Sequence, residues 1–240
     1  MKTRNLISYN LLMTGIFGIL FSSALASCSN KKKESTDESS EWIDITHHNY
    51  YMNDYNSIIS YAVVKNLLDV PVKNTLIVTT LKDANGDVLE ATTNNAGLIP
   101  PGESIPIKSI FKDGHKMEWE KVEVKFSKAK KLDRRTIHTD FELQNVTLKD
   151  DYRSSFIKKV TGTVVNTGDT KAEWVDVYAI FFDKQDRIVA SASSGIKGSR
   201  DLAFGEKGDF SAGTNTAAGE IDRVEVTVIA KSPEWHNFQN

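Results

Sequence analysis

Hydrophobic and polar residues alternate along much of this chain with the two-residue period of a β-strand. Val122, Val124 and Phe126 alternate with charged residues, so one face of that segment is apolar and the other is charged. The segment 59–63 alternates in the same way. The stretch 174–182 is apolar on both faces, which predicts a central strand covered on each side. No segment after the N-terminal region carries a persuasive helical pattern, so we predict an all-β fold.

Turn-forming residues separate these predicted strands. Asn85-Gly86 lies between two strand-like segments and predicts a hairpin. The segments 100–102 and 166–169 are further breaks, rich in proline, glycine, asparagine and aspartate. The residues 128–135 are basic and poor in glycine and proline, and we expect them to form a short solvated connector.

The pattern of strands and turns occurs twice. Asn66 and Asn166 lie 100 positions apart, as do Asp83 and Asp183, and the surrounding apolar residues keep the same spacing. Several short strands in each of two copies of about 95 residues predict tandem antiparallel immunoglobulin-like β-sandwiches. We place them at 41–130 and 131–240.

The second copy contains Ile180-Phe181-Phe182-Asp183 after a valine-asparagine strand. This order of motifs resembles the FxLYD domain of bacterial exported proteins, and the first copy follows it with 80–83, which lacks the paired aromatic residues. The resemblance implies an immunoglobulin-like fold. It also implies no catalytic residues, because the family carries no established ones.

The N-terminus has the features of a secretory signal. Lys2 and Arg4 precede an apolar run, 11–21, that is shorter than the roughly 20 residues of a membrane span. Leu25, Ala26, Ser27 and Cys28 follow this run and resemble a bacterial lipobox. The resemblance implies removal of residues 1–27 and attachment of a diacylglyceryl group to Cys28. An ordinary cleaved signal peptide with a chance cysteine is the alternative.

The residues after Cys28 are polar throughout. Segment 28–40 is rich in serine and charge, which predicts a disordered tether. Lys31, Lys32 and Lys33 either contact anionic headgroups or are simply solvated, and we favour the solvated tether. Loss of Lys2 and Arg4 from 30 basic residues leaves 28 against 32 acidic residues, a net charge of −4. We therefore expect a lipid-anchored protein of the bacterial envelope, facing outside the cytoplasm, without a nucleic-acid partner.

Candidate metal and catalytic residues are few. Asp83, Asn85 and Asp87 resemble the start of a calcium loop, but the glycine and glutamate required later in an EF-hand are absent, so we favour a turn. His47 and His48 are neighbours on a predicted strand and point to opposite faces. We expect no metal, no cofactor and no catalytic residues, because no nucleophile elbow or ligand cluster is present.

The repeated Asn66, Asn166, Asp83 and Asp183 have two interpretations. A ligand site used twice would repeat them, and so would a structural device in which each side chain fixes its own turn. We favour the structural device.

Three functions are considered, and we favour the first. The first is a non-catalytic protein-interaction module that offers loops or edge strands to an envelope or extracellular partner. The second is a protein that binds a glycan, peptide or small ligand at the seam between the two copies, in a groove with aromatic residues such as Trp119 or Trp174. The third is an unrecognised hydrolase with a site assembled from distant residues. The aromatic tail at 235–238 is either a partner contact or packs back on the second copy.

Overall fold

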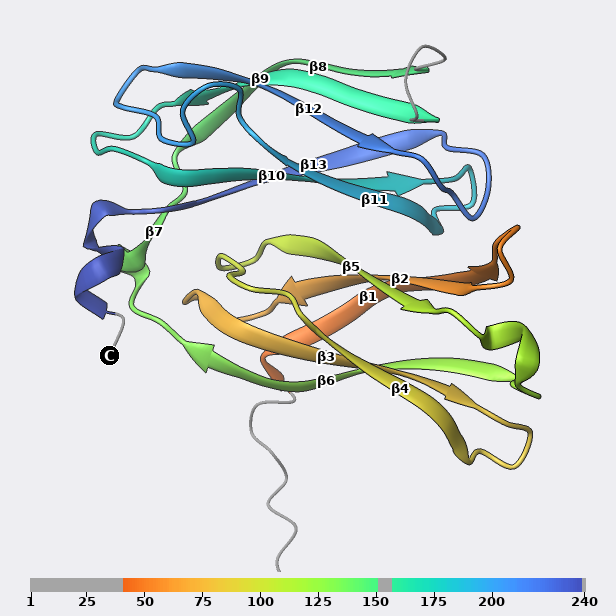
Figure 1. The fold of residues 1–240 in the computed structure, drawn as a ribbon. Helices are drawn as coiled ribbons and strands as arrows, with labels where there is room; N and C mark the ends of the chain where they lie inside the picture. Colours follow the sequence, from red (N-terminus) through yellow and green to blue (C-terminus); the bar gives the residue numbers. More distant parts are fainter. Residues whose placement is uncertain (1–40, 151–156, 239–240) are drawn as a thin grey trace, which may run out of the picture. The chain divides into compact units, whose positions relative to one another are not determined.

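A computed structural model describes residues 41–150 and 157–238, so Leu25, Ala26, Ser27, Cys28 and the predicted tether lie outside the described residues. Within the described part, thirteen strands form four antiparallel sheets (Figure 1). The predicted all-β fold is confirmed. No helix in the described ranges is long and apolar enough to cross a membrane.

The first sandwich pairs a β1-β2-β5 sheet with a β4-β3-β6 sheet. Its strands are β1 (Ile43–Met52), β2 (Ile58–Asn66), β3 (Val72–Lys82), β4 (Val88–Asn95), β5 (Ser104–Phe111) and β6 (Lys121–Lys131), with the 3₁₀ turn η2 (Gly114–Lys116) between the last two. Its core includes Val64, Ile77 and Ile105, which come from both sheets. The predicted apolar face at Val122 points inward, since this side chain is buried.

The second sandwich repeats the order of the first. Its strands are β8 (Phe141–Asp150), β9 (Lys158–Asn166), β10 (Glu173–Phe182), β11 (Ile188–Gly195), β12 (Lys207–Thr214) and β13 (Arg223–Lys231). The sheets are β12-β9-β8 and β11-β10-β13, and the short β7 (Ile137–His138) extends the latter by pairing with β13. The 3₁₀ turns η3 (Arg134–Thr136) and η4 (Pro233–Phe238) flank this sandwich in sequence. The predicted pair of β-sandwiches is thus confirmed.

The two sandwiches pack face to face, and residues 41–150 and 157–238 belong to one compact unit. The β1-β2-β5 sheet lies against the β11-β10-β13 sheet, so the four sheets stack in layers (Figure 1). The prediction that β10 is covered on both sides is confirmed. Val177 and Phe181 fill the second core, while Ile180 and Phe182 pack on β2 of the first sandwich.

The two faces of β2 differ from the sequence prediction. Alternation predicted one apolar face at Ile59, Tyr61 and Val63, yet both faces are buried. Ile58 and Val64 point into the cores of the first sandwich, whereas the predicted apolar face meets the second sandwich. The residues between Ile58 and Val64 on the core-facing side are small, so the hydrophobic pattern of the sequence did not mark that face as buried.

The predicted connector at 128–135 is shorter than expected. Strand β6 continues to Lys131, because Lys130 and Lys131 pair with Lys73 and Val72 of β3. Asp133 then begins η3 by accepting a hydrogen bond from the Arg135 backbone. The chain passes through this single 3₁₀ turn directly into β7.

Candidate functional site

The two repeated asparagines are structural. Asn66 is fully buried, and its amide donates to the carbonyl oxygens of Val70 at 2.9 Å and of Ile99 and Pro100 at 3.1 Å. Its side-chain oxygen accepts from the Leu68 backbone at 3.0 Å. The amide group and the oxygen of the side chain are thus both bonded within the protein, which confirms the structural device at this position.

Asn166 makes three equivalent contacts and adds one. Its amide donates to the Thr170 and Leu202 carbonyls at 2.8 and 2.9 Å, and its oxygen accepts from the Gly168 backbone at 3.0 Å. The same oxygen lies 2.8 Å from Nε2 of His138, which is buried. The sequence analysis missed this role of His138. A Cβ on Gly168 would lie 2.6 Å from the histidine ring, so the glycine of this turn is needed for the contact.

The two repeated aspartates hold hairpins. One oxygen of Asp83 accepts from the Asn85 and Asp87 backbones, each at 2.9 Å. Asp183 does the same for Gln185 and Arg187 and also pairs with the Arg187 guanidinium at 2.7 Å. Burial alone would raise the pKa of Asp183, but the donors of Arg187 and Gln185 outweigh it and lower this pKa. The predicted turn at 83–87 is therefore confirmed.

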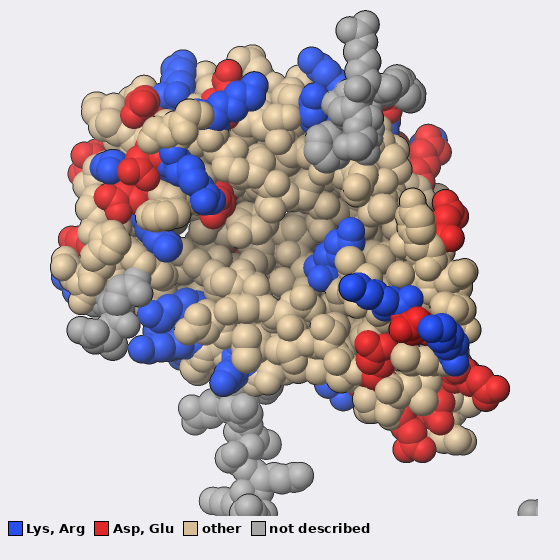
Figure 2. All heavy atoms as spheres, in the orientation of Figure 1, with Lys and Arg blue, Asp and Glu red and all other residues tan. Residues whose placement is uncertain are grey.

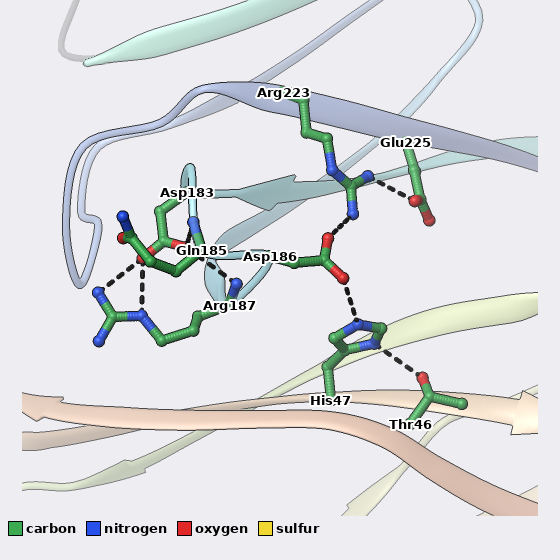
Figure 3. A network of polar contacts seen from close by, with 8 residues as sticks. All are labelled: Thr46, His47, Asp183, Gln185, Asp186, Arg187, Arg223 and Glu225. Carbon is green, nitrogen blue, oxygen red and sulfur yellow. Dashed lines mark hydrogen bonds and ion pairs between the residues drawn. The ribbon is translucent and has the colours of Figure 1, made fainter.

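One end of the seam is joined by charged side chains (Figure 3). His47 of β1 lies with Nε2 3.4 Å from an Asp186 oxygen, and Asp186 also pairs with Arg223 of β13. Arg223 lies 3.9 Å over the ring of Phe182 and donates to Glu225 at 2.5 Å. The hydrogen bond from Arg223, with a smaller one from His47, lowers the pKa of Asp186. This exposed network links the sandwiches, and Nδ1 of His47 also lies 3.0 Å from the hydroxyl oxygen of its sequence neighbour Thr46.

The histidine pair behaves as predicted. His47 points to the seam, where its ring meets Phe182 edge-on at 5.1 Å. His48 points to the other face and contacts Ser60 Oγ at 3.1 Å. Burial lowers the pKa of His48, so it is uncharged near neutral pH. The two rings share no partner.

The middle of the seam is closed by Tyr61. Its hydroxyl lies 3.2 Å from Thr216 Oγ1 of the second sandwich, and Lys108 Nζ lies 5.7 Å over its ring. Burial raises the pKa of Tyr61 to about 12, which keeps the hydroxyl protonated. Tyr61 itself is fully buried at this point of the seam.

At the other end the seam opens into a groove. Two adjoining hollows of about 430 and 240 Å³ share Gly97, Leu98 and Lys231. We call them together the seam groove. Its walls are Lys73, Asn74, Gly97 and Leu98 from the first sandwich and Trp174, Asp176, Tyr178, Arg200, Ile229, Ala230, Lys231 and Trp235 from the second. The seam groove therefore joins residues that are far apart in sequence.

Cations and indole rings alternate along the seam groove. Lys231 Nζ lies 4.5 Å from the ring centre of Trp235 and 5.4 Å from that of Trp174. Lys73 Nζ lies 5.5 Å over Trp235, and the Arg200 guanidinium lies 5.4 Å over Trp174. We call this row, from Lys73 to Arg200, the cation–π ladder. Such contacts at exposed sites contribute about 0.5–1 kcal/mol each.

Trp174 has an unusual backbone. It lies in a β-bulge of β10 with φ of 54°, in the left-handed region, and half of its side chain is exposed. The first sandwich has the same bulge in β3, where Asn74 has φ of 52°. Asparagine tolerates this conformation and bulky side chains rarely adopt it. A tryptophan here is therefore strained where an asparagine is comfortable.

The charge of the seam groove is uneven. Asp176 is paired with Arg200, whereas neither Lys73 nor Lys231 has a carboxylate partner among the described residues. In Figure 2 lysine and arginine gather at the lower left, over the ends of β3 and β6, while acidic and basic residues are mixed above them on the second sandwich and at the β3–β4 hairpin end. Lys73 and Lys130 are cross-strand partners at that basic end. The groove therefore opens beside a positive surface.

The predicted aromatic residues divide between two places. Trp174 lines the seam groove, as the ligand hypothesis expected, but Trp119 does not. Trp119 packs against a small core of the first sandwich and meets Tyr50 edge-on at 5.7 Å. Trp235 of the tail lies in the groove against lysines of both sandwiches. The alternation of cations and rings is a tertiary feature without a sequence motif.

Comparisons with known proteins give no assignment. No family model matches the chain, and no curated protein matches it. Among solved structures, the crystal structure of red sea bream transglutaminase is similar at 10% sequence identity with a TM-score of 0.26. The match covers 79% of this chain and 31% of that chain, so this chain spans about a third of its length. A likeness this distant assigns neither a fold nor an activity to this chain. Among the described residues no three of His, Cys, Asp and Glu group to hold a metal ion.

Proposed function

We propose that this chain is a lipid-anchored, non-catalytic binding protein of the bacterial envelope, and that the seam groove is its binding surface. Cys28 carries the lipid, and the residues after it tether the two sandwiches outside the cytoplasm. The sandwiches are distant FxLYD-type domains. The ligand is a glycan, a peptide or a small molecule.

The observation that carries the proposal is the position of Trp174. A half-exposed indole in a left-handed bulge costs stability, and the first sandwich fills the same bulge with Asn74. Strain of this kind is typically retained at sites where the side chain contacts a ligand. Ligand sites are also typically concave and lined by aromatic side chains with a few polar groups, and the seam groove has this composition.

The anchor rests on the lipobox resemblance. Each buried methylene contributes about 0.8 kcal/mol, so two or more acyl chains hold a protein to a bilayer almost irreversibly. A protein held in this way needs no spanning helix. Mass spectrometry of the membrane-extracted protein should find a mature N-terminus at a diacylglyceryl-modified Cys28. An unmodified cysteine would refute the anchor but leave the groove open to test.

The binding surface is tested by a screen of the mature protein against immobilised glycans and peptides. Trp174→Asn is the diagnostic variant, because Asn74 occupies the same bulge in the first sandwich without loss of fold. We expect bound ligands to be lost in this variant and kept in Trp119→Phe, which changes a tryptophan outside the groove. Ligands that bind the Trp174→Asn variant equally well would refute the seam groove as the site.

A second function is supported by a different observation. Strand β4 is an edge of the β4-β3-β6 sheet, and Val88 and Leu89 on it are 56% and 40% exposed. Edge strands accept partner strands through their backbone groups. Under this hypothesis an envelope protein cross-links to β4. Its recovery should be lost when Thr93 is changed to proline, because the alternation of hydrogen-bonded pairs with β3 leaves the backbone donor of Thr93 at the free edge, and it should be retained in Trp174→Asn.

A further inference from the structure

We infer that the ligand of the seam groove is an acidic saccharide, whose rings lie on Trp174 and Trp235 and whose carboxylates meet Lys73 and Lys231. This inference rests on the proposed function, since it names the ligand class of the same groove. It follows from the ring surfaces, the charges and the paired backbone of the groove walls.

The seam groove presents the ring surfaces of two tryptophans. Trp174 is half exposed, and Trp235 lies beside it across Lys231, so the groove presents two indoles in one row. The C–H face of a pyranose ring packs on a flat aromatic surface. Successive rings of an oligosaccharide would therefore pack on the parts of the two indoles that the cations of the cation–π ladder leave uncovered.

The charges select an anion. Asp176 is the only carboxylate among the described lining residues, and its charge is already met by Arg200. Lys73 and Lys231 have no acidic partner among the described residues, and both Nζ atoms are held beside the Trp235 ring. A carboxylate that enters the groove meets two ordered cations and no uncompensated negative charge. Burial, assisted by Asp176, raises the pKa of Tyr178, so its hydroxyl stays a hydrogen-bond donor.

The backbone of the groove walls disfavours a peptide. An extended peptide binds through unpaired donors and acceptors of a strand edge. Here β10 and β13 already pair with each other, with Glu173 opposite Lys231 and Asp176 opposite Ile229. The groove thus offers side chains rather than a free strand edge. A bilayer surface would need rings that protrude, whereas these indoles line a hollow.

Trigalacturonate and its methyl ester are a matched pair of probes, because they share ring geometry and differ in charge. Titrated into the mature protein and followed by tryptophan fluorescence, the acid should bind at least about tenfold more tightly than the ester. Its affinity should fall as salt rises from about 50 to about 500 mM, because the lysines are partly exposed and screened. Equal affinity for acid and ester would overturn the acidic class and leave the proposed function standing.

Two variants locate the binding. Trp174→Asn should lose at least about tenfold in affinity for trigalacturonate while its thermal midpoint stays equal or rises, since the bulge is relieved. Lys231→Gln should remove most of the preference for acid over ester. Lys184→Gln, an exposed lysine outside the groove, is the matched control and should change neither.

Two results would overturn the inference in distinguishable ways. If anionic phosphatidylglycerol vesicles shift the fluorescence in a Trp174-dependent manner and trigalacturonate does not, the groove binds a lipid surface and the saccharide class is wrong. If neither acid nor ester binds, and the Trp174→Asn variant matches the parent against every immobilised glycan and peptide, the proposed function fails as well.

Discussion

The two sandwiches have the same strand order, but one sheet face is apolar in the first sandwich and polar at the equivalent positions of the second. In the first sandwich this face of β2 is apolar and buried against the second sandwich. In the second sandwich the equivalent face of β9 is polar and lines an open hollow of about 620 Å³. The aligned positions, 100 apart, are Ile59, Tyr61 and Val63 against Lys159, Thr161 and Thr163.

The partner face differs in the reverse sense. Ile180 and Phe182 of β10 are apolar and meet β2, whereas the equivalent Thr80 and Lys82 of β3 are polar. Lys82 is paired with Glu123 at 2.8 Å on that outer face. The apolar face of β2 in the first sandwich and the apolar face of β10 in the second sandwich cover each other. The difference explains how a head-to-tail packing, which could in principle continue, ends at two units.

The largest expected effect comes from breaking the apolar side of this comparison. Phe182→Ala should lower the free energy of unfolding by about 3–5 kcal/mol, because the side chain is fully buried in the seam. Lys82→Ala at the equivalent position should cost less than about 1 kcal/mol. Urea unfolding of both variants measures the contrast. Similar losses in the two would mean that the seam is not a hydrophobic interface.

The buried asparagines test the part of the fold that the copies share. Asn66→Ala and Asn166→Ala should each cost about 1–3 kcal/mol, because backbone carbonyls lose their donors. The Asn166 variant should cost more, since it also removes the contact of Asn166 with Nε2 of buried His138. Asn85→Ala, at an exposed turn, is the control. Differential scanning calorimetry of the three variants would contradict us if the exposed position were as sensitive as the buried ones.

Acid should lower the stability that the ion pair of Glu123 and Lys82 contributes on the polar outer face. Hydrogen bonds from Lys82 and then Lys125 lower the pKa of Glu123 from 4.5 to about 2. Its stabilising contribution is therefore complete above pH 4.5 and is lost as the pH falls toward 2. Glu123→Gln should remove about 1 kcal/mol or less of the stability difference between pH 7 and pH 2. In a double-mutant cycle, Lys82→Met should add little to this variant, and full additivity would show that the pair does not interact.

The smallest effect on unfolding should come from grafting the apolar face. Lys159→Ile, Thr161→Tyr and Thr163→Val together change surface positions, so the free energy of unfolding should move by less than about 0.5 kcal/mol per site. The grafted face should nevertheless associate with its copy on another molecule, because exposed apolar patches of this kind do so. Sedimentation velocity should show dimers. A monomer would mean that shape, rather than polarity, limits the packing to two units.

The strands were predictable from the sequence because alternation and turn residues act locally. The coverage of β10 on both faces was also predictable, since Ile180 and Phe182 extend an apolar run. What covers that strand was not predictable from one copy. Comparison of residues 59–63 with 159–163 identifies the covering face. The apolar residues of the first copy are replaced by polar ones in the second, which indicates a face that is buried in one copy and exposed in the other.

The candidate site was less predictable. Trp174 was named for an aromatic groove and lies there, but Trp119 does not, because both are equally aromatic in sequence and only tertiary packing separates them. The cation–π ladder joins residues from Lys73 to Trp235 that no local pattern relates. The strained bulge has one sequence signal, the asparagine at the equivalent position 74. The anchor at Cys28 stays a prediction.

The seam also has a consequence for synthesis. Ribosomes deliver the N-terminal sandwich first, and domains generally fold as units in that order. The nascent first half must wait with the β2 face of Ile59, Tyr61 and Val63 uncovered until β10 has been made and folded. During that interval the incomplete chain exposes an apolar surface that is prone to aggregation. A chaperone would protect the chain most at this stage.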